Sequence, residues 1–239
     1  MKYTWRPDLG DVRDHLYTAA PVARPPVVDL QAKCLPVFDQ GQLGSCTGNA
    51  LAGALGFLHP DLTASRLFIY YNERSMEGTV RQDAGASIRD GVKTLVKLGA
   101  CPEAKWPYDI ARFRRRPLKA CYTAALPHRV ASYTRIQSLD DMLNCLASGF
   151  PFVFGFTVYS AFESGEMART GVLNLPAQGE KVLGGHAVMA VGYDLAAKRI
   201  KVRNSWGTGW GIDGSGYFSM PFDYLTHRGL SDDFWTLRK

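Results

Sequence analysis

Hydrophobic positions in the first half of the chain repeat with the period of a helix. Leu51, Leu55 and Leu58 recur at the spacing of one helix face, with small residues between them. Ser45 is a suitable N-cap, so the helix is predicted to begin at Cys46. Two further helices are expected, an aromatic-rich one over residues 65–73 and one that follows the N-cap Ser87 and ends at Gly99.

From about residue 129 the pattern changes to the alternation that is typical of strands. Strands are predicted over residues 129–136, 151–158, 186–193, 199–204 and 216–220, with a hairpin turn at 194–198. A short helix is expected after Ser138, in a sequence that resembles a capping box. A helical first half and a sheet-rich second half predict an α+β chain in two lobes, about 27–128 and about 129–239, preceded by an N-terminal extension over residues 1–26.

Cys46 has the most reactive side chain in the predicted first helix. Free backbone N–H groups and the positive end of the helix dipole stabilise a thiolate in the first turn of a helix. A nucleophilic cysteine is therefore one interpretation, and a buried, inert cysteine is the alternative. The helix alone does not separate them.

Length and composition allow a full hydrophobic core in one or two lobes, with 239 residues of which 46% are hydrophobic. The net charge is +6, and part of it lies in the basic run that includes Arg114 to Arg116. A weak anion contact at this run is one interpretation. A solvated loop is favoured, because no nucleic-acid-binding motif accompanies it.

The N-terminus is charged and is interrupted by Pro7, so it does not read as a Sec signal peptide. No apolar run has the length that a bilayer span needs, which predicts a soluble monomer, either cytoplasmic or exported by another route. No cofactor is implied. No metal is implied either, because the four histidines outside the motifs below lack a second ligand at zinc-site spacing: His15, His59, His128 and His227.

Three motifs occur in one order along the chain. The first is Gln-Gly-x-x-Gly-Ser-Cys, which begins at Gln40 and ends at Cys46. The second begins at His186 and reads His-Ala-Val-x-Ala-Val-Gly-Tyr, and the third begins at Asn204 and reads Asn-Ser-Trp-Gly-Thr-Gly-Trp-Gly. His186 follows Cys46 by 140 residues and Asn204 comes 18 residues later, which is the Cys, His and Asn pattern of papain-like proteases.

Over roughly residues 27 to 220 the chain therefore resembles the papain-like cysteine protease family, in a bacterial-like variant without the usual long prosegment. The resemblance implies a cleft between a helical lobe that carries the cysteine and a sheet lobe that carries the histidine and asparagine. Cys46 would be the nucleophile, His186 its base and acid, and Asn204 the residue that orients the imidazole. Trp206 would shield the His–Asn contact, and Gln40 would donate an N–H to the oxyanion.

The resemblance also assigns residues that bind substrate. Gly85 corresponds to the glycine-rich turn whose backbone holds the substrate in this family. Gly185 is expected to line a specificity pocket, with Phe156 and Val158 as another wall. We therefore expect a hydrophobic P2 side chain in the substrate.

Two positions depart from the family pattern. Leu43 stands where secreted relatives usually have a disulfide-forming cysteine, and Thr47 stands where an aromatic residue usually follows the nucleophile. The first departure favours a chain that does not depend on an oxidising compartment. Besides Cys46, four cysteines allow two bridges or none, and Cys145 reads as core: Cys34, Cys101, Cys121 and Cys145.

Residues 1–26 are polar and then proline-rich, with Pro21, Pro25 and Pro26 in an extended arm. Family members often carry a prosegment along the cleft, so one hypothesis is that this arm blocks the cleft as a short strap, as in a zymogen. An ordinary extension that packs elsewhere is the alternative.

The predicted function is that of a cysteine endopeptidase acting on peptide or protein substrates. Two alternatives keep the same site and change the reaction, to exopeptidase activity or to acyl transfer. In an exopeptidase, the N-terminal arm or residues 162–180 would block one end of the cleft. A binding protein on the same fold is the alternative from another class, and retention of both Cys46 and His186 argues against it.

Overall fold

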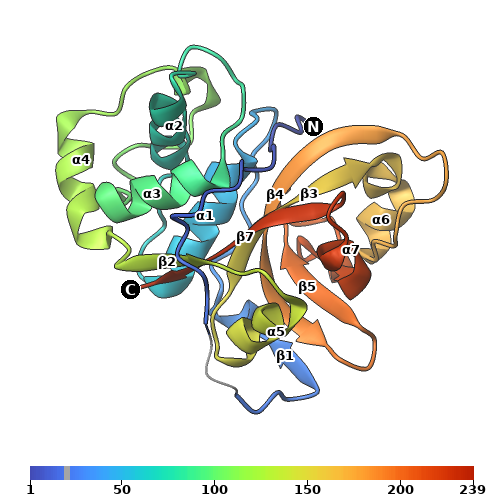
Figure 1. Ribbon diagram of the computed structural model, residues 1–239. Helices are drawn as coiled ribbons and strands as arrows, with labels where there is room; N and C mark the ends of the chain where they lie inside the picture. Colours follow the sequence, from blue (N-terminus) through green and yellow to red (C-terminus); the bar gives the residue numbers. More distant parts are fainter. Residues whose placement is uncertain (19–21) are drawn as a thin grey trace.

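In the described residues, seven strands form one antiparallel sheet, and six of them come from the second half of the chain (Figure 1). The computed structural model describes residues 1–18 and 22–239. In the sheet the strand order is β2-β7-β3-β4-β5-β6, and β1 pairs with β4 outside this path. The strands are β1 (Val27–Asp29), β2 (Ser132–Arg135), β3 (Phe152–Tyr159), β4 (Val182–Asp194), β5 (Arg199–Arg203), β6 (Tyr217–Pro221) and β7 (Ser231–Arg238).

Helices α1 to α4 lie on one side of the molecule, and α5 to α7 accompany the sheet (Figure 1). The α-helices are α1 (Cys46–Leu58), α2 (Arg66–Glu77), α3 (Ile88–Lys97), α4 (Lys119–Ala125), α5 (Leu139–Ala147), α6 (Gly165–Thr170) and α7 (Phe222–Thr226). Short 3₁₀ turns cover Gln31–Lys33, Ile110–Arg112, Leu126–His128, Ser160–Glu163 and Ile212–Gly214.

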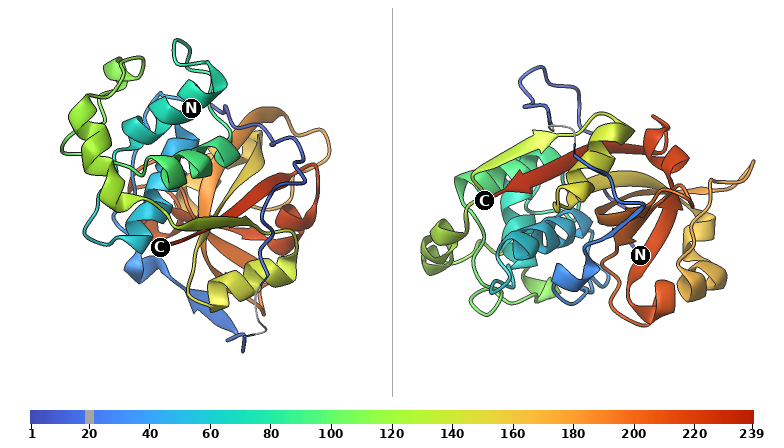
Figure 2. Two further views of the ribbon diagram at one scale, coloured as in Figure 1. Left: turned by 60° about the vertical axis from the view of Figure 1, so that its left-hand side comes forward. Right: turned by 90° about the horizontal axis from the view of Figure 1, so that it is seen from below.

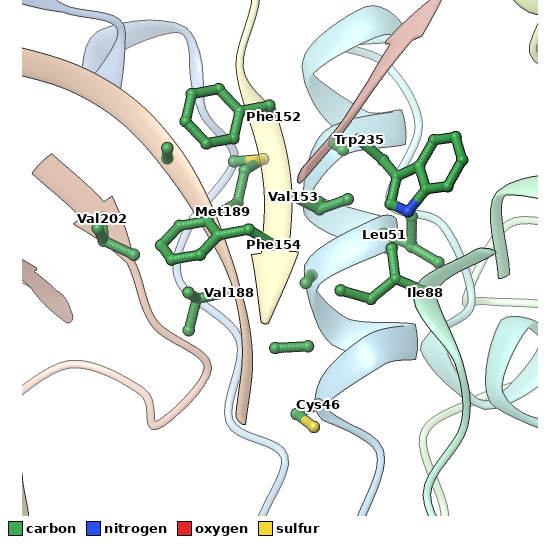
Figure 3. Close-up of a cluster of buried hydrophobic side chains, with 14 of the residues drawn as sticks. Cys46, Leu51, Ile88, Phe152, Val153, Phe154, Val188, Met189, Val202 and Trp235 are labelled. Carbon is green, nitrogen blue, oxygen red and sulfur yellow. The ribbon is translucent and has the colours of Figure 1, made fainter. Parts of the chain in front are cut away.

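Helix α1 is buried from Cys46 to Gly56, between the sheet and the other helices. Its small residues allow this, because they let neighbouring backbones approach closely. A Cβ added at Gly48 would lie 2.9 Å from the carbonyl oxygen of Arg66 in α2. Figure 3 shows the core around the helix, where Leu51 lies near Ile88 and Trp235 while Phe154 and Met189 come from the sheet.

The predicted helices after Cys46, Ser65, Ser87 and Ser138 are confirmed, and three of the four serines cap as expected. Ser65, Ser87 and Ser138 each accept a hydrogen bond from the backbone N–H three residues on. Ser45 differs, because its hydroxyl bonds to Tyr108 and to the Asn49 amide. The position of α1 therefore depends on packing more than on a cap.

The strands predicted in the second half are confirmed, including the hairpin in which Asp194 of β4 faces Arg199 of β5. The strand predicted over 129–136 is shorter, since β2 covers only Ser132–Arg135. Strands β1 and β7 and helices α4, α6 and α7 were not predicted. The division into lobes at residue 128 stays a prediction, and β1 pairs with β4 although it precedes that boundary.

Residues 1–18, which we call the N-terminal segment, run between the helices and the sheet (Figures 1 and 2). Pro21 of the predicted extended arm lies outside the described residues. Over residues 1–18 and 22–239, none of the helices combines the length and apolar character needed to cross a bilayer.

The close contact of α1 with α2 predicts a destabilising effect for Gly48→Ala. Alanine is favoured over glycine inside a helix by about 1 kcal/mol, yet its methyl group would meet the Arg66 carbonyl. We expect a net loss of about 1–3 kcal/mol in the free energy of unfolding, measured by urea denaturation. Gly165→Ala in α6 is the control, because its added Cβ meets nothing within 4 Å in the described part of the chain. An equal effect of both substitutions would contradict the contact argument.

Candidate active site

Cys46 is the first residue of α1, and its side chain is fully buried. Its thiol lies at the backbone of Ala187 and at the side chain of Thr4. Burial raises the pKa of the thiol, and hydrogen bonds from the backbone of Ala187 and Thr47 oppose this. Because Ala187 follows His186 on β4, the fold brings the cysteine of the first motif to the histidine of the second.

The His186 imidazole is held by Asn204, which follows β5. His186 Nε2 and Asn204 Oδ1 are 2.8 Å apart, and the same oxygen accepts the backbone N–H of Ser205 at 2.8 Å. Since Oδ1 is an acceptor, Nε2 carries the proton and Nδ1 carries the lone pair. Within the described residues, Nδ1 is buried without a hydrogen-bond partner. The free lone pair on Nδ1 is the position at which the imidazole can accept a proton.

Burial lowers the pKa of His186 to about 4, and the hydrogen bond with Asn204 opposes this only in part. The thiol pKa of Cys46 is raised by the same cause. Burial thus favours the neutral form of both groups.

A wall of aromatic rings shields the His186–Asn204 pair. The Trp206 ring lies 5.6 Å from the His186 ring, centroid to centroid, at an interplanar angle of 33°. Phe162 and Trp210 in turn pack against Trp206, with centroids 4.9 and 5.1 Å away. His186 is 1% exposed and Asn204 is 2% exposed, so their hydrogen bond lies out of water.

Gln40 lies beside the third motif, the one that begins at Asn204. Its Oε1 accepts the Ser205 hydroxyl at 2.6 Å, and its Nε2 donates to the Leu43 carbonyl at 3.1 Å. Its backbone N–H also donates to the Ser205 carbonyl at 2.9 Å. The side chain is thereby fixed next to Asn204, and one N–H of the amide is left over after the bond to Leu43.

Three residues of the N-terminal segment cover these groups. The Tyr3 ring lies 6.0 Å from the His186 ring. The Thr4 hydroxyl donates to the Gly44 carbonyl at 2.9 Å, and the Trp5 backbone N–H donates to the Gly185 carbonyl at 3.0 Å. The segment therefore occupies the surface where the sequence predicts substrate.

Both glycines assigned to substrate binding touch this segment. Gly85 has φ +75°, and an added Cβ would lie 2.4 Å from the Thr4 carbonyl oxygen. An added Cβ at Gly185 would lie 2.2 Å from the Trp5 carbonyl oxygen. The structure thus places Gly85 and Gly185 around the same extended chain as Cys46.

The predicted pocket wall of Phe156 and Val158 needs a correction. Both side chains are fully buried, and Phe156 packs on Phe162 at 5.2 Å, on the side of β3 away from Trp5. Alternation along the strand turns Gly155 toward Trp5 instead.

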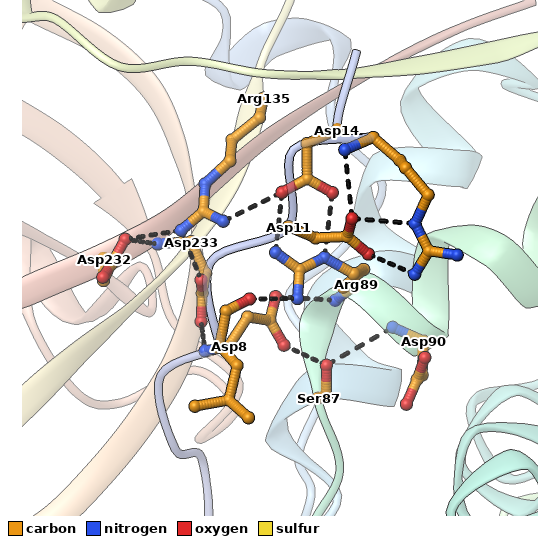
Figure 4. Close-up of polar contacts among 11 residues, drawn as sticks. Asp8, Asp11, Asp14, Ser87, Arg89, Asp90, Arg135, Asp232 and Asp233 are labelled. Carbon is orange, nitrogen blue, oxygen red and sulfur yellow. Dashed lines mark hydrogen bonds and ion pairs between the residues drawn. The ribbon is translucent and has the colours of Figure 1, made fainter. Parts of the chain in front are cut away.

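Further along the segment, Asp14 joins α3 to β2 (Figure 4). Its carboxylate accepts Arg89 Nε at 3.0 Å and Nη2 at 2.6 Å, and it accepts Arg135 Nη1 at 3.0 Å. Burial alone would raise the pKa of Asp14, but the two guanidinium groups hold it below its usual range. One carboxylate of the segment thus contacts both sides of the molecule.

Asp8 makes a second connection of the same kind (Figure 4). Its carboxylate contacts the Ser87 hydroxyl and accepts the Arg89 backbone N–H at 3.2 Å. Its backbone N–H donates to Asp233 Oδ2 of β7 at 2.8 Å. Between the two connections the chain is open to solvent, with Leu9 88% exposed and Val12 fully exposed.

A family model for papain family cysteine proteases matches residues 25–233. The chain belongs to this family. Among the curated relatives of this papain-family chain, an uncharacterized peptidase C1-like protein of Acanthamoeba polyphaga mimivirus is 42% identical, over 87% of this chain and 71% of the relative. A cathepsin B-like protein of Giardia intestinalis is 30% identical, over 78% of this chain and 64% of the relative.

Solved structures show the same relation. The crystal structure of xylellain, a cysteine protease from Xylella fastidiosa, superposes with a TM-score of 0.91 and 42% identity, covering 99% of this chain and 96% of that one. A digestive procathepsin L of Tenebrio molitor shares the fold at a TM-score of 0.70 and 18% identity, over 95% of this chain and 74% of that one. The predicted family, the α+β papain-like fold and the class of cysteine peptidase are confirmed.

The remaining cysteines of this papain-like peptidase are free thiols in the described residues. Cys145 is fully buried in α5, as predicted for a core residue, and Cys34 is partly exposed. The anion contact at Arg114 to Arg116 stays a prediction.

The residues that bring the N-terminal segment to the site were not predicted from the sequence. Tyr3 and Trp5 are two aromatic residues in an otherwise charged terminus, which was the available indication that it packs on something. The connections of Asp8 and Asp14 had no comparable indication, because their arginine partners lie far away in the sequence.

The ion pairs of Asp14 predict a pH-dependent contribution to stability. The folded-state pKa is lowered, so the contribution is present above the unfolded value of about 3.9 and is lost as pH falls through the folded value. We expect Asp14→Asn to reduce the free energy of unfolding at pH 7 by about 3 kcal/mol, because it leaves Arg89 and Arg135 without their partner. Urea denaturation at pH 7 and near pH 3 measures the difference, which should shrink in acid. A difference that does not change with pH would contradict this account.

Proposed function

We propose that this papain-family protein is a cysteine endopeptidase whose own N-terminal segment holds it inactive. The observation that carries the proposal is that Tyr3, Thr4 and Trp5 contact His186, Cys46 and Gly185 together. Cys46 is 0% exposed and His186 1% exposed beneath them. A substrate has to displace this segment before it reaches the thiol.

The reaction begins with transfer of the Cys46 thiol proton to the free Nδ1 lone pair of His186. The thiolate attacks the carbonyl carbon of the peptide bond, and the imidazolium gives its proton to the departing amine. This leaves an acyl-enzyme thioester. Water, deprotonated by the same imidazole, then attacks the thioester, which releases the acid and restores the thiol.

Asn204 supports this role of His186 by fixing which nitrogen carries the proton. Its Oδ1 accepts from Nε2 and so leaves Nδ1 for the cysteine. The oxyanion is assigned to the spare N–H of Gln40 and to the backbone N–H of Cys46 at the start of α1.

While the N-terminal segment covers the site, an ion pair between a Cys46 thiolate and a His186 imidazolium is disfavoured. Burial favours the neutral thiol and the neutral imidazole. Departure of the N-terminal segment would readmit water, which lowers the desolvation cost of a thiolate and an imidazolium. The segment therefore acts in two ways, because it excludes substrate and keeps the nucleophile protonated.

The path of the segment favours endopeptidase activity over exopeptidase activity. Thr4 lies at the Cys46 thiol, with residues of the segment before it and others after it as far as Asp8, whose backbone N–H donates to Asp233 Oδ2 at 2.8 Å. Phe162, at the start of the stretch considered as a block, is buried in the aromatic wall. The products of cleavage distinguish the two reactions, because an endopeptidase cuts peptides that are blocked at both ends.

The contacts of Trp5 predict that Trp5→Ala activates the full chain. Removing the indole from its buried position costs about 3–5 kcal/mol of packing energy, which loosens the segment. We expect the rate of hydrolysis of an end-blocked peptide to rise at least about 10-fold.

Leu9→Ala is the matched control in the same segment, because Leu9 is 88% exposed and the activity should stay unchanged. Circular dichroism verifies that the variants are folded. Equal activity of the original chain and Trp5→Ala would overturn autoinhibition, and hydrolysis that persists in a Trp5→Ala, Cys46→Ala double variant would overturn the assignment of the nucleophile.

The role of Asn204 predicts a loss in kcat when its side chain is removed. In the Trp5→Ala background, Asn204→Ala should lower kcat on the order of 10²-fold with a smaller change in KM, because substrate contacts are retained. Asn174→Ala, outside the site, serves as the control. A rise in KM at constant kcat would instead assign Asn204 to substrate binding.

A further inference from the structure

One tyrosine hydroxyl contacts both ends of the loop that leads to the nucleophile. Tyr108 Oη donates to the Gln40 carbonyl at 3.0 Å, and it shares a hydrogen bond with the Ser45 hydroxyl. Gln40 begins the first motif and Ser45 directly precedes Cys46, and both are 0% exposed. The hydroxyl therefore joins the proposed oxyanion donor to the start of α1.

The direction of each hydrogen bond in this group can be assigned. A tyrosine hydroxyl has one hydrogen, and Tyr108 gives it to the Gln40 carbonyl, which can only accept. The hydrogen between Ser45 and Tyr108 therefore comes from Ser45. Asn49 Nδ2 in turn donates to Ser45 Oγ at 3.0 Å. The bonds form one chain from Asn49 to Gln40, in which each hydroxyl donates once and accepts once.

The Tyr108 hydroxyl is the central member of this chain. Burial raises its pKa, so it keeps its proton and remains a donor at neutral pH. Hydrogen bonds that run in one direction polarise one another, so removal of the central hydroxyl weakens the bonds on both sides. Because Ser45 and Gln40 are buried, water does not replace the lost partner.

The Tyr108 ring is itself fixed by Arg66 of α2. The guanidinium carbon of Arg66 lies 3.8 Å from the centre of the ring. Arg66 Nη1 also donates to the Asp39 carbonyl at 2.9 Å, and Nη2 pairs with Glu103 Oε1 at 2.6 Å. The tyrosine is thereby held against α2 while its hydroxyl contacts the loop.

Gln40 is held from two directions. The Ser205 hydroxyl donates to Gln40 Oε1 at 2.6 Å, and the Ser205 carbonyl accepts the Gln40 backbone N–H at 2.9 Å. These two bonds fix Gln40 relative to Asn204 and so to the histidine. The bond from Tyr108 fixes the carbonyl of the same residue relative to α2. Gln40 thus lies between the part of the fold that orients the imidazole and the part that presents the thiol.

We propose that Tyr108 is a positioning residue that holds both oxyanion donors in place, Gln40 directly and the Cys46 backbone N–H through Ser45. The inference rests on the proposed function, because it takes these two groups as the donors to the oxyanion. Donors that are fixed before the reaction stabilise the developing charge without a cost of reorganisation. Tyr108 therefore affects the rate through the geometry of the donors and not through a contact with the substrate.

The test removes only the hydroxyl, with Tyr108→Phe in the Trp5→Ala chain. We expect kcat for an end-blocked peptide to fall about 10-fold or more while KM stays within about 2-fold, because the oxyanion exists only after attack. Tyr122→Phe is the matched control. Tyr122 is also half-buried, and its hydroxyl donates to Asn72 Oδ1 at 3.1 Å and not to the loop before Cys46. Its kcat should stay within about 2-fold of the parent.

A peptide aldehyde gives a second measurement that a general loss of structure would not reproduce. The Cys46 sulfur bonds to the aldehyde carbon, the C=O double bond becomes a single bond, and the thiol proton passes to the oxygen, so no atom leaves. This oxygen takes the place of the oxyanion. Tyr108→Phe should weaken inhibition by the aldehyde about 10-fold or more and leave binding of the corresponding peptide alcohol within about 2-fold.

Ser45→Ala tests the chain of hydrogen bonds, because it removes the link between Asn49 and Tyr108. Where bonds act together, a double variant loses less than the product of the two single losses. We expect this result in kcat for Ser45→Ala combined with Tyr108→Phe. Losses that simply multiply would contradict a chain that acts as one unit.

Three other results would contradict the inference. These are a rise in KM at constant kcat, an equal weakening of the aldehyde and the alcohol, and an equal loss in Tyr122→Phe. If the Trp5→Ala chain cleaves no peptide, the proposed function fails, and hydrogen exchange measured by NMR decides the role of Tyr108 separately. In the chain that keeps Trp5, Tyr108→Phe should speed exchange of the Gln40 backbone N–H about 10-fold or more, and Tyr122→Phe should not. Unchanged exchange in Tyr108→Phe rejects the inference.

Discussion

The structure depends on the close packing of α1 against β4 and α2. The helix can lie there because glycines and alanines replace larger residues along it, and Gly48 and Gly53 face the backbone of α2 and the Arg203 side chain. This packing carries Cys46 to Ala187 and so to His186. Since the Ser45 hydroxyl bonds to Tyr108 and Asn49, burial and not a serine cap holds the start of the helix.

Occupation of the site changes the chemistry of the residues beneath it. The rings of Tyr3 and Trp206 both pack near the His186 ring, and burial lowers the His186 pKa to about 4. The same burial strengthens the hydrogen bond to Asn204. The exclusion of water thus keeps the His186 ring oriented and also disfavours its protonated form.

The residues that we propose to react could be singled out from the sequence because the chemistry demands particular residue types in a fixed order. Cys46, His186 and Asn204 belong to three motifs, and each motif also carries the local turn or strand that presents it. The periodicity of hydrophobic positions, short in both strands and helices, likewise predicted β3 to β6 and α1 to α3.

Contacts between distant residues could not be predicted in the same way. Trp5 meets Gly155, and Asp14 meets Arg89 and Arg135, through pairings that only the folded chain defines. The pocket wall was misassigned to Phe156 because apolar character alone does not tell which face of a strand a residue occupies. Alternation from Gly155 resolves the face once the register with β4 is known.

The covalent continuity between the N-terminal segment and the peptidase has a kinetic consequence. A tethered segment acts at an effective concentration that does not depend on the protein concentration, so dilution alone would not release it. A peptide in solution would have to compete for the site against the segment at that effective concentration. The inhibition that we propose would therefore be a property of each single molecule and would not depend on the protein concentration.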